Sequence, residues 1–279
     1  MKKTYLFLIL TLCFLACKQS PKDKAEDSVS EEKPIAIEMV TTKGTIVLKL
    51  YNETPLHRDN FVRLVNEKAF DNLLFHRVIE NFMVQAGDPD SRNAKLTDTL
   101  GVGDLPYKID AEINTPYFHK KGTLGAARDG NVARASSAMQ FYIVQGKVQN
   151  DSLLSVAEGR INGWLAEHYF KNDTVNKSLV EALQKAESAD DFKTYTALTD
   201  TIMRKSKSYT DFEKYTIPEA HREVYKTIGG TPHLDQNYTV FGEVVDGLEV
   251  IDAIAKVETN NLDRPLDDVR IISVRILEN

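Results

Sequence analysis

Large apolar residues recur at every second position in residues 35–40 and again in residues 45–50, on either side of the turn-forming sequence Thr-Thr-Lys-Gly. Because the side chains of a strand alternate between two faces, this period predicts a β-hairpin with one buried face. A helix is predicted to follow, with Thr54 as its N-cap and Pro55 at its first position.

Further short apolar segments predict more strands, separated by loops that contain glycine and proline. Residues 70–75 lead back into a strand, and residues 88–107 are predicted to form a loop. Residues 246–249 resemble a capping box for a helix that runs to Ala255. Many short strands with few helices indicate a mostly β protein, a closed antiparallel barrel with helices at its ends. The later strands are expected at 122–127, 139–145, 238–245 and 269–277.

Residues 148–228 interrupt this series of short strands. Apolar residues recur there at roughly helical spacing, residues 216–219 indicate a helix start, and Gly229 with Gly230 indicates a stop. The segment also contains the chain's single tryptophan, Trp164. We therefore expect a helical insertion within a strand domain that spans residues 35–279.

The first residues have the pattern of a bacterial export signal. Lys2 and Lys3 precede a short apolar run that ends at Ala16 and is followed by Cys17, which resembles a lipoprotein signal whose cysteine is acylated. Residues 1–16 would then be a signal peptide, and the charged and serine-rich residues 17–34 a flexible tether. An ordinary signal peptide or an uncleaved anchor is the alternative. The lipoprotein interpretation predicts a lipid-anchored protein of the bacterial cell envelope, facing the periplasm or exposed on the surface.

Composition narrows the possible chemistry. Both cysteines, Cys13 and Cys17, lie in this first segment, so the body is expected to fold without disulfides and to hold no thiol nucleophile or cysteine metal ligand. The formal net charge of −6 leaves no basic excess that could follow a nucleic-acid backbone. We expect no metal, no cofactor and no nucleic-acid partner. Four histidines are too dispersed along the chain to suggest a metal site, namely His57, His119, His168 and His221.

Residues 75–88 set one arginine and one glutamine among large apolar residues. A guanidinium is always charged, and bringing it near apolar surface is costly unless something there needs its donors. The sequences Phe75-His76-Arg77-Val78-Ile79 and Phe82-Met83-Val84-Gln85-Ala86-Gly87-Asp88 look like the central signature of cyclophilin-type peptidyl-prolyl cis-trans isomerases. Residues 122–128, 140–143 and 234–247 resemble later motifs of that family. The resemblance covers roughly residues 35–147 and 229–279, and the insertion has no counterpart in the minimal family domain.

The resemblance implies an eight-stranded antiparallel barrel capped by two helices, with a proline-binding groove on its outer surface. It implies that Arg77 is the catalytic arginine and that Gln85 orients it and contacts the substrate backbone. His233 stands where many family members have tryptophan. The implied substrate-binding residues are Phe82, Met83, Tyr142 and Leu234 around the prolyl ring, Ala127 and Arg128 through main-chain groups, Gln140 in the adjoining groove, and Tyr238.

Peptide-bond rotation needs no nucleophile. The amide resists twisting with a barrier of ~18–20 kcal/mol because its nitrogen lone pair is delocalised. In the twisted transition state this lone pair localises, so a donor aimed at the nitrogen stabilises the twisted state more than the planar ones. The expected substrates are proline-containing exported polypeptides. The alternatives are a non-catalytic module of the same fold, acting as a chaperone or peptide binder through its insertion, and a structural envelope lipoprotein; the oligomeric state is not predicted.

Overall fold

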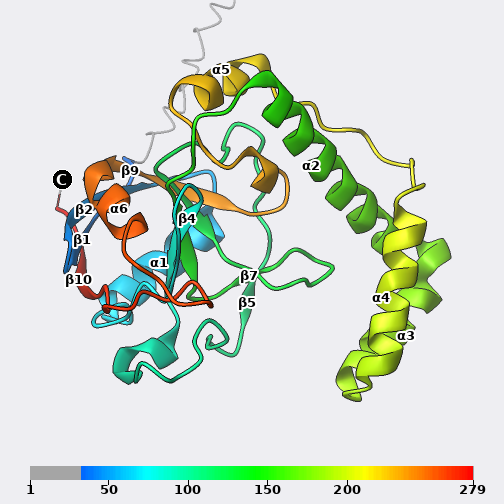
Figure 1. Ribbon diagram of the computed structural model, residues 1–279, viewed down its shortest axis with the longest axis horizontal. Coiled ribbons are helices and arrows are strands. Elements are labelled where there is room, and N and C mark those ends of the chain that lie inside the picture. The colour runs from blue at the N-terminus through cyan, green and yellow to red at the C-terminus, as the bar shows by residue number, and fades with distance from the viewer. Residues whose placement is uncertain (1–32, 279) are drawn as a thin grey trace, which may run out of the picture. The chain divides into compact units, whose positions relative to one another are not determined.

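Eight strands form one antiparallel sheet in the computed structural model, which describes residues 33–278 (Figure 1). The predicted signal peptide, Cys17 and nearly all of the predicted tether lie outside the described residues. The strands of the large sheet are β1 (Ala36–Thr41), β2 (Gly44–Leu50), β3 (Arg77–Ile79), β4 (Met83–Ala86), β6 (Thr123–Ala126), β8 (Phe141–Val144), β9 (Val240–Asp246) and β10 (Ile271–Ile276). Their order in the sheet is β10-β1-β2-β9-β6-β8-β4-β3, and β5 (Lys108–Ile109) pairs separately with β7 (Ser136–Ser137).

The sheet curls into a half-barrel and is not the closed barrel that was expected. Its edge strands β3 and β10 share no ladder within residues 33–278. Residues 72–75 instead exchange backbone hydrogen bonds with residues 269–271, for example from the Phe75 N–H to the Val269 C=O at 2.9 Å. Residues 70–75, which were predicted to lead back into a strand, form turns with one bridge, between Leu74 and Arg270, and the strand β3 follows them.

Two helices bury one face of this sheet. Helix α1 (Pro55–Asn66) and helix α6 (Leu248–Ala255) contribute to the same apolar cluster as the strands. Phe141 of β8 lies at its centre and packs edge-on against Phe61 and Phe70, with ring centroids 5.6 Å apart in each pair. One continuous core thus holds the strands and both helices together.

The starts of both helices differ in their chemistry from the prediction. Thr54 is the N-cap of α1, but its side chain makes no capping bond. The carboxylate of Glu112 caps the helix instead, accepting hydrogen bonds from the backbone N–H groups of Leu56 and His57 at 3.0 and 2.9 Å. The predicted capping box before α6 is wrong, because Gly247, with a left-handed φ of 87°, is the N-cap there and no side chain caps the helix.

The insertion contains four helices, α2 (Asp151–Asn172), α3 (Lys177–Ser188), α4 (Phe192–Ser206) and α5 (Glu219–Thr227). The chain leaves and re-enters the strand domain at one place, where the Gly230 N–H donates to the Lys147 C=O at 3.1 Å. Gly230 has a φ of 155°, and a Cβ there would collide with the carbonyl oxygen of His119. Only glycine fits this close approach, which explains the glycine pair at the end of the insertion.

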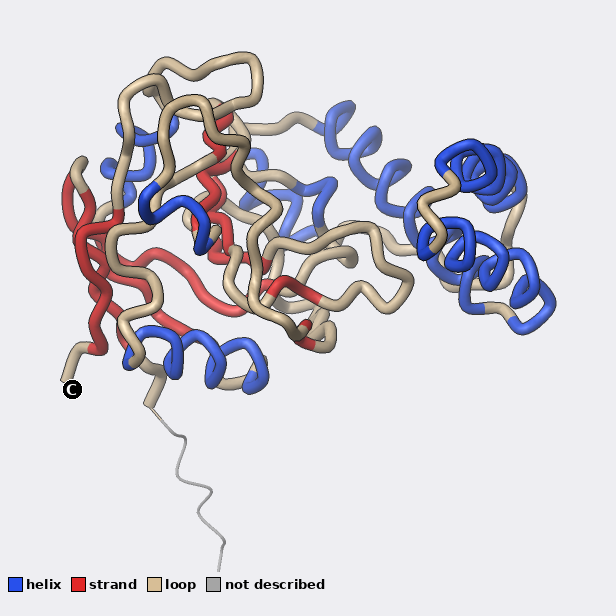
Figure 2. Tube along the Cα trace, turned by 90° about the horizontal axis from the view of Figure 1, so that it is seen from below, coloured by secondary structure: helices blue, strands red, loops and turns tan. Residues whose placement is uncertain are grey.

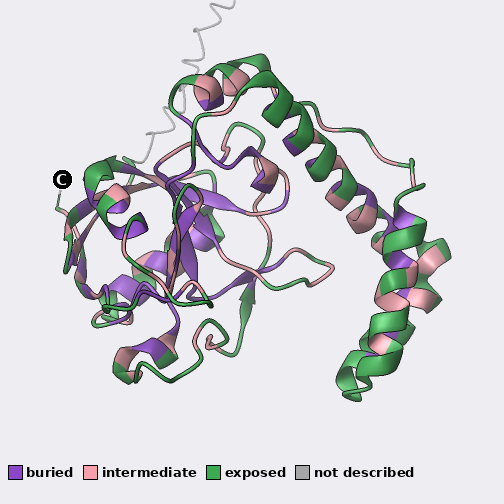
Figure 3. Ribbon diagram, viewed as in Figure 1, coloured by how far each residue is buried: buried purple, intermediate pink, exposed green. Residues whose placement is uncertain are grey.

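Two small apolar clusters hold the insertion. The first joins α2 and α5 and takes in Phe118 from the strand domain. The second joins the end of α2 to α3 and α4 around Phe170, Leu183 and Ile202. Most of the surface of α3 and α4 is exposed (Figure 3). The insertion therefore has an inner part, α2 with α5, that packs on the strand domain, and an outer part, α3 with α4.

The protein is mixed in secondary structure and not mostly β, as Figure 2 shows by its blue helices and red strands. The four helices of the insertion, added to α1 and α6, account for the difference from the expected mostly β protein. No helix within residues 33–278 is both long enough and apolar enough to cross a membrane.

Candidate active site

A row of directly paired residues crosses the outer face of the sheet. Arg77 faces Gln85 between β3 and β4, Gln85 faces Tyr142 between β4 and β8, and Tyr142 faces Gly125 between β8 and β6. The adjacent row lies in the core and consists of Val78, Val84, Ile143 and Leu124. Because side chains alternate along a strand, burying this second row places the first row outside.

The row begins in a tight hairpin between β3 and β4. Asn81 adopts a left-handed φ of 63° at the turn, a conformation that asparagine tolerates better than most residues. Its N–H donates to the side-chain oxygen of Gln145 at 2.6 Å, which ties the turn to the end of β8. The hairpin brings Phe82 and Met83 beside Arg77, although they follow it by several residues.

A pocket of about 160 Å³ lies on this outer face. Nine of the ten catalytic and substrate-binding residues expected from the sequence line it, and the tenth, Gln140, contacts it only through Gln85. One wall is apolar, since Met83, Tyr142 and Leu234 form a buried cluster, and Arg77, Gln85 and Arg128 add polar groups. The lining residues are Arg77, Phe82, Met83, Gln85, Ala127, Arg128, Tyr142, Leu234 and Tyr238.

The guanidinium of Arg77 is held by Asp263 and not by Gln85, contrary to the expectation. Its Nε donates to Asp263 Oδ2 at 3.3 Å, and no hydrogen bond joins it to Gln85 within the described part of the chain. Both side chains are about two-fifths exposed, so solvent screens the pair and its strength is modest. Because only the Nε edge is occupied, the two terminal amino groups of Arg77 stay available to a ligand.

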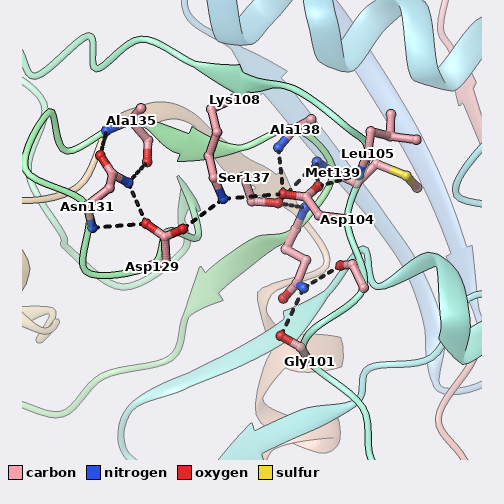
Figure 4. A network of polar contacts seen from close by, with 12 residues as sticks. Gly101, Asp104, Leu105, Lys108, Asp129, Asn131, Ala135, Ser137, Ala138 and Met139 are labelled. Carbon is pink, nitrogen blue, oxygen red and sulfur yellow. Dashed lines mark hydrogen bonds and ion pairs between the residues drawn. The ribbon is translucent and has the colours of Figure 1, made fainter. Parts of the chain in front are cut away.

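Gln85 is fixed by Gln140. The Gln85 Nε2 donates to Gln140 Oε1 at 2.9 Å, while Gln140 Nε2 donates to the carbonyl oxygens of Gly101 and Gly103 at 3.1 and 2.7 Å. Asp104 anchors the same segment by accepting from the Met139 N–H at 3.1 Å (Figure 4). These hydrogen bonds fix the orientation of the side-chain amides of Gln85 and Gln140. The side-chain oxygen of Gln85 has no donor within residues 33–278 and can accept a hydrogen bond from a ligand.

The main-chain groups expected to bind substrate are not equally available. The Ala127 N–H donates to the Gln140 C=O at 2.9 Å, and the Ala127 C=O accepts from the Ser137 N–H at 2.8 Å. Among the described residues no backbone bond uses the N–H or the C=O of Arg128. Among the described residues, Arg128 therefore keeps main-chain groups that could bind a peptide, whereas those of Ala127 are already paired, and both residues line the pocket.

A buried polar network stands behind Tyr142. Its hydroxyl lies 2.8 Å from His119 Nε2, and His119 Nδ1 lies 2.8 Å from Asp235 Oδ1. The hydroxyl of Tyr225 in α5 donates to the other oxygen of Asp235 at 2.8 Å. Since an ionised carboxylate only accepts, His119 Nδ1 is the donor, and in the neutral ring Nε2 accepts from Tyr142. Gly125 makes room for this arrangement, because a Cβ there would collide with the Tyr142 ring.

The insertion reaches the apolar wall of the pocket through Trp164. This side chain packs against the cluster of Met83, Tyr142 and Leu234 and meets His233 edge-on, with ring centroids 6.4 Å apart. His233 in turn stacks on Phe82 at 5.5 Å. Burial, with the nearby charge of Arg160, lowers the pKa of His233 to about 4, so its ring is neutral at pH 7. Helix α2 thus places a tryptophan beside His233 and the apolar wall of the pocket.

Sequence reasoning missed several of these supporting residues. Asp263 is 186 positions from Arg77 and no motif signals it. His119, Asp235 and Tyr225 lie in three separate segments, and only the folded chain brings them together. Trp164 was visible as a single tryptophan, but its place beside the pocket depends on the packing of α2.

Comparison with known proteins agrees with this fold. A family model described as "Cyclophilin type peptidyl-prolyl cis-trans isomerase/CLD" matches residues 36–201 and 219–276. Because the matched residues make up well over half of the chain, the protein belongs to the cyclophilin-type peptidyl-prolyl cis-trans isomerases, a family of enzymes. The stretch between the two matched segments lies within the helical insertion.

Relatives and solved structures carry similar names. A Staphylococcus aureus protein named "Putative peptidyl-prolyl cis-trans isomerase" is 28% identical over 250 residues, covering 89% of this chain and 94% of that protein. A Staphylococcus saprophyticus protein of the same name is 28% identical over 246 residues, covering 88% and 92%. A crystal structure of a cyclophilin-type isomerase from Cryptosporidium parvum covers 88% of this chain and 99% of its own, with a TM-score of 0.51 and 16% identity. A sequence identity this low means that the likeness shows the fold alone. A second structure of the same protein, solved in the presence of the dipeptide Ala-Pro, matches this chain with a TM-score of 0.50.

Proposed function

We propose that this protein accelerates the rotation of X-Pro peptide bonds without covalent chemistry, by donation of a hydrogen bond from Arg77 to the prolyl nitrogen. The observation that carries the proposal is the pocket itself, which sets apolar walls from Phe82, Met83 and Leu234 beside a guanidinium with free terminal donors. The apolar walls would hold the prolyl ring and exclude water. The guanidinium would stabilise the lone pair that localises when the bond twists.

The remaining polar groups would hold the peptide on either side of the bond. The Gln85 oxygen would accept from a substrate N–H, since the bond from the amide nitrogen to Gln140 fixes the orientation of the side chain. The free main-chain groups of Arg128 would pair with the residue before the proline. With the ring and one side of the bond fixed, the other side can turn, which is the geometry that rotation requires.

The test is exchange spectroscopy by NMR on a short X-Pro peptide. We expect Arg77→Ala to lower kcat/KM roughly 10²–10³-fold, as loss of one preorganised electrostatic donor does in other enzymes. Arg204→Ala is the matched control, because it removes an exposed arginine from α4, away from the pocket. Unchanged catalysis by Arg77→Ala would contradict the mechanism.

We also propose that the protein is anchored by an acylated Cys17 in the bacterial cell envelope and acts there on exported, proline-containing polypeptides. The support is the sequence alone, a short apolar run followed by cysteine and a charged segment. Expression with a labelled fatty acid tests it: the full chain should carry label and fractionate with membranes, and Cys17→Ser should lose both. A Cys17→Ser protein that stays labelled would show that another residue carries the acyl group, and an unlabelled wild-type chain would show that there is no lipid anchor.

A further inference from the structure

A second cavity, of about 290 Å³, adjoins the prolyl pocket and shares Arg128 and Tyr238 with it. One side is the loop of residues 128–134, and the other is helix α2, which contributes Trp164 and His168 among others. His168 Nδ1 lies 3.2 Å from the Val132 carbonyl oxygen, which ties the loop to the helix. The strand domain alone cannot form this cavity, because the insertion supplies one of its walls.

Two arginines that line the cavity lack a carboxylate partner within residues 33–278. The Nε of Arg128 donates to the Asn237 C=O at 2.9 Å, and Nη1 of Arg134 donates to the Gln236 C=O at 2.6 Å. The Nε of Arg134 is buried with no hydrogen-bond partner. Neutral carbonyl groups therefore position both guanidiniums and leave their charges without a counter-ion from the protein.

The carboxylates that line the cavity are already neutralised. Asp129 is paired with Lys108 at 2.9 Å, a contact drawn in Figure 4, and Glu167 is paired with Lys171 at 2.5 Å. Burial lowers the pKa of Arg134, and the nearby charge of Arg128 lowers it further. The paired carboxylates and the lowered pKa of Arg134 both indicate a partly buried site with surplus positive charge. Such a site is energetically unfavourable until an anion binds.

We propose that this cavity is a specificity subsite for an acidic side chain, aspartate or glutamate, located among the few residues that precede the proline in the substrate. The amino-terminal side follows from Arg128, whose free main-chain groups face the residue before the proline in the proposed function and whose side chain lines the cavity. A carboxylate would receive charge-assisted hydrogen bonds from Arg128 and Arg134, and Trp164 would cover its apolar stem. This inference rests on the proposed isomerase function and adds a preference to it.

The experiment compares matched peptides by NMR exchange: one with glutamate and one with glutamine at each of the three positions before the proline, and the same pair after it. We expect about a tenfold higher kcat/KM for glutamate at one of the preceding positions, the size of one or two charge-assisted hydrogen bonds. The preference should shrink as ionic strength rises, because salt screens a partly exposed pair. Equal rates for glutamate and glutamine, or a preference only after the proline, would overturn the subsite.

Charge reversal keeps the test independent of folding defects. Arg134→Gln should bring the glutamate-to-glutamine ratio close to one, and Arg134→Glu should favour a lysine peptide over the glutamate peptide, a gain that misfolding cannot produce. Arg204→Gln, an equal charge change in the outer part of the insertion, should leave the ratio as in the wild type. A ratio unaffected by Arg134→Glu would refute the subsite, whereas failure to isomerise any of the peptides would refute the proposed function instead.

Discussion

The strand domain and the helical insertion differ in the size of their apolar cores, and each contributes a different part of the site. The strand domain has one continuous core, shared by the sheet and helices α1 and α6, and the row from Arg77 to Gly125 stands on the outer face of that core. The insertion has two small clusters, and the outer one rests on three buried residues. The side chains proposed to act on the X-Pro bond therefore lie on the well-packed sheet. The side chains proposed to bind substrate residues next to that bond come partly from the less extensively packed insertion.

Equivalent core truncations should separate the two regions most clearly. Phe141→Ala removes a ring that packs edge-on against Phe61 and Phe70 and should lower the free energy of unfolding by about 3–5 kcal/mol. Phe170→Ala makes the same chemical change in the outer cluster of the insertion. Because that cluster is small, we expect it to open α3 and α4 locally while the strand domain keeps its midpoint.

Hydrogen exchange measured by mass spectrometry distinguishes these outcomes. Phe141→Ala should speed exchange throughout the sheet, and Phe170→Ala only in residues 177–206 and the adjoining end of α2. An equal shift of the global unfolding midpoint by both variants would show that the two regions fold as one cooperative unit.

The same contrast explains what could be predicted from the sequence. The alternation in residues 35–50, the motif around Arg77 and the later motifs in residues 122–128, 140–143 and 234–247 are local signals. The alternation predicted the hairpin, and the motifs together contain the nine residues that line the pocket. The partners of those residues are not local. Asp263 reaches Arg77 from a turn far along the chain, and Glu112 caps α1 in place of Thr54, because any suitably placed acceptor can satisfy a free N–H group. Trp164 shows the same limit, since periodicity indicates a helix but not the surface on which it packs.

Acid should weaken the strand domain through His76. This ring is buried in the motif next to Arg77, and neither of its nitrogens has a hydrogen-bond partner within residues 33–278. Burial, partly opposed by the charge of Asp88, lowers its pKa to about 4, whereas in the unfolded chain the ring takes up a proton near pH 6.5. Between these values the unfolded state binds more protons, so the free energy of unfolding should fall as the pH drops from about 6.5 to 4, by up to about 3 kcal/mol, and then level off.

Denaturant unfolding at a series of pH values measures this loss, and His76→Leu provides the comparison. The variant should be less sensitive to acid across that window, because it has no proton to take up. The pKa of His168 is also lowered to about 4, by burial and by the charge of Arg134. His168 lines a cavity, however, where solvent screens the charge of a protonated ring more than it does at His76. His168→Leu should therefore change the pH profile less than His76→Leu, and the reverse ranking would contradict the packing contrast between the two regions.

The smallest expected effect concerns a buried hydrogen bond between the two regions. The Tyr225 hydroxyl of α5 donates to Asp235, and Asp235 fixes His119, which holds the hydroxyl of Tyr142 in the prolyl pocket. Tyr225→Phe should cost about 1–3 kcal/mol of stability, since it removes a donor from a buried carboxylate. It should also lower kcat/KM a few-fold, because the Tyr142 ring is then held less firmly.

A double-mutant cycle separates the catalytic effect from the structural one. In a Tyr142→Phe background the pocket no longer depends on His119, so Tyr225→Phe should still lower stability but should leave kcat/KM unchanged. Tyr209→Phe is the control, because it removes a hydroxyl bonded to Asp173 at 3.1 Å in the outer part of the insertion. Equal losses of kcat/KM from Tyr225→Phe in both backgrounds would mean that α5 influences the pocket by another route, such as the packing of α2 and Trp164. The alternative result is that the effects of Tyr225→Phe and Tyr142→Phe on the free energy of unfolding add, while their effects on kcat/KM do not. That result would show that this chain of hydrogen bonds couples the position of the insertion to the pocket.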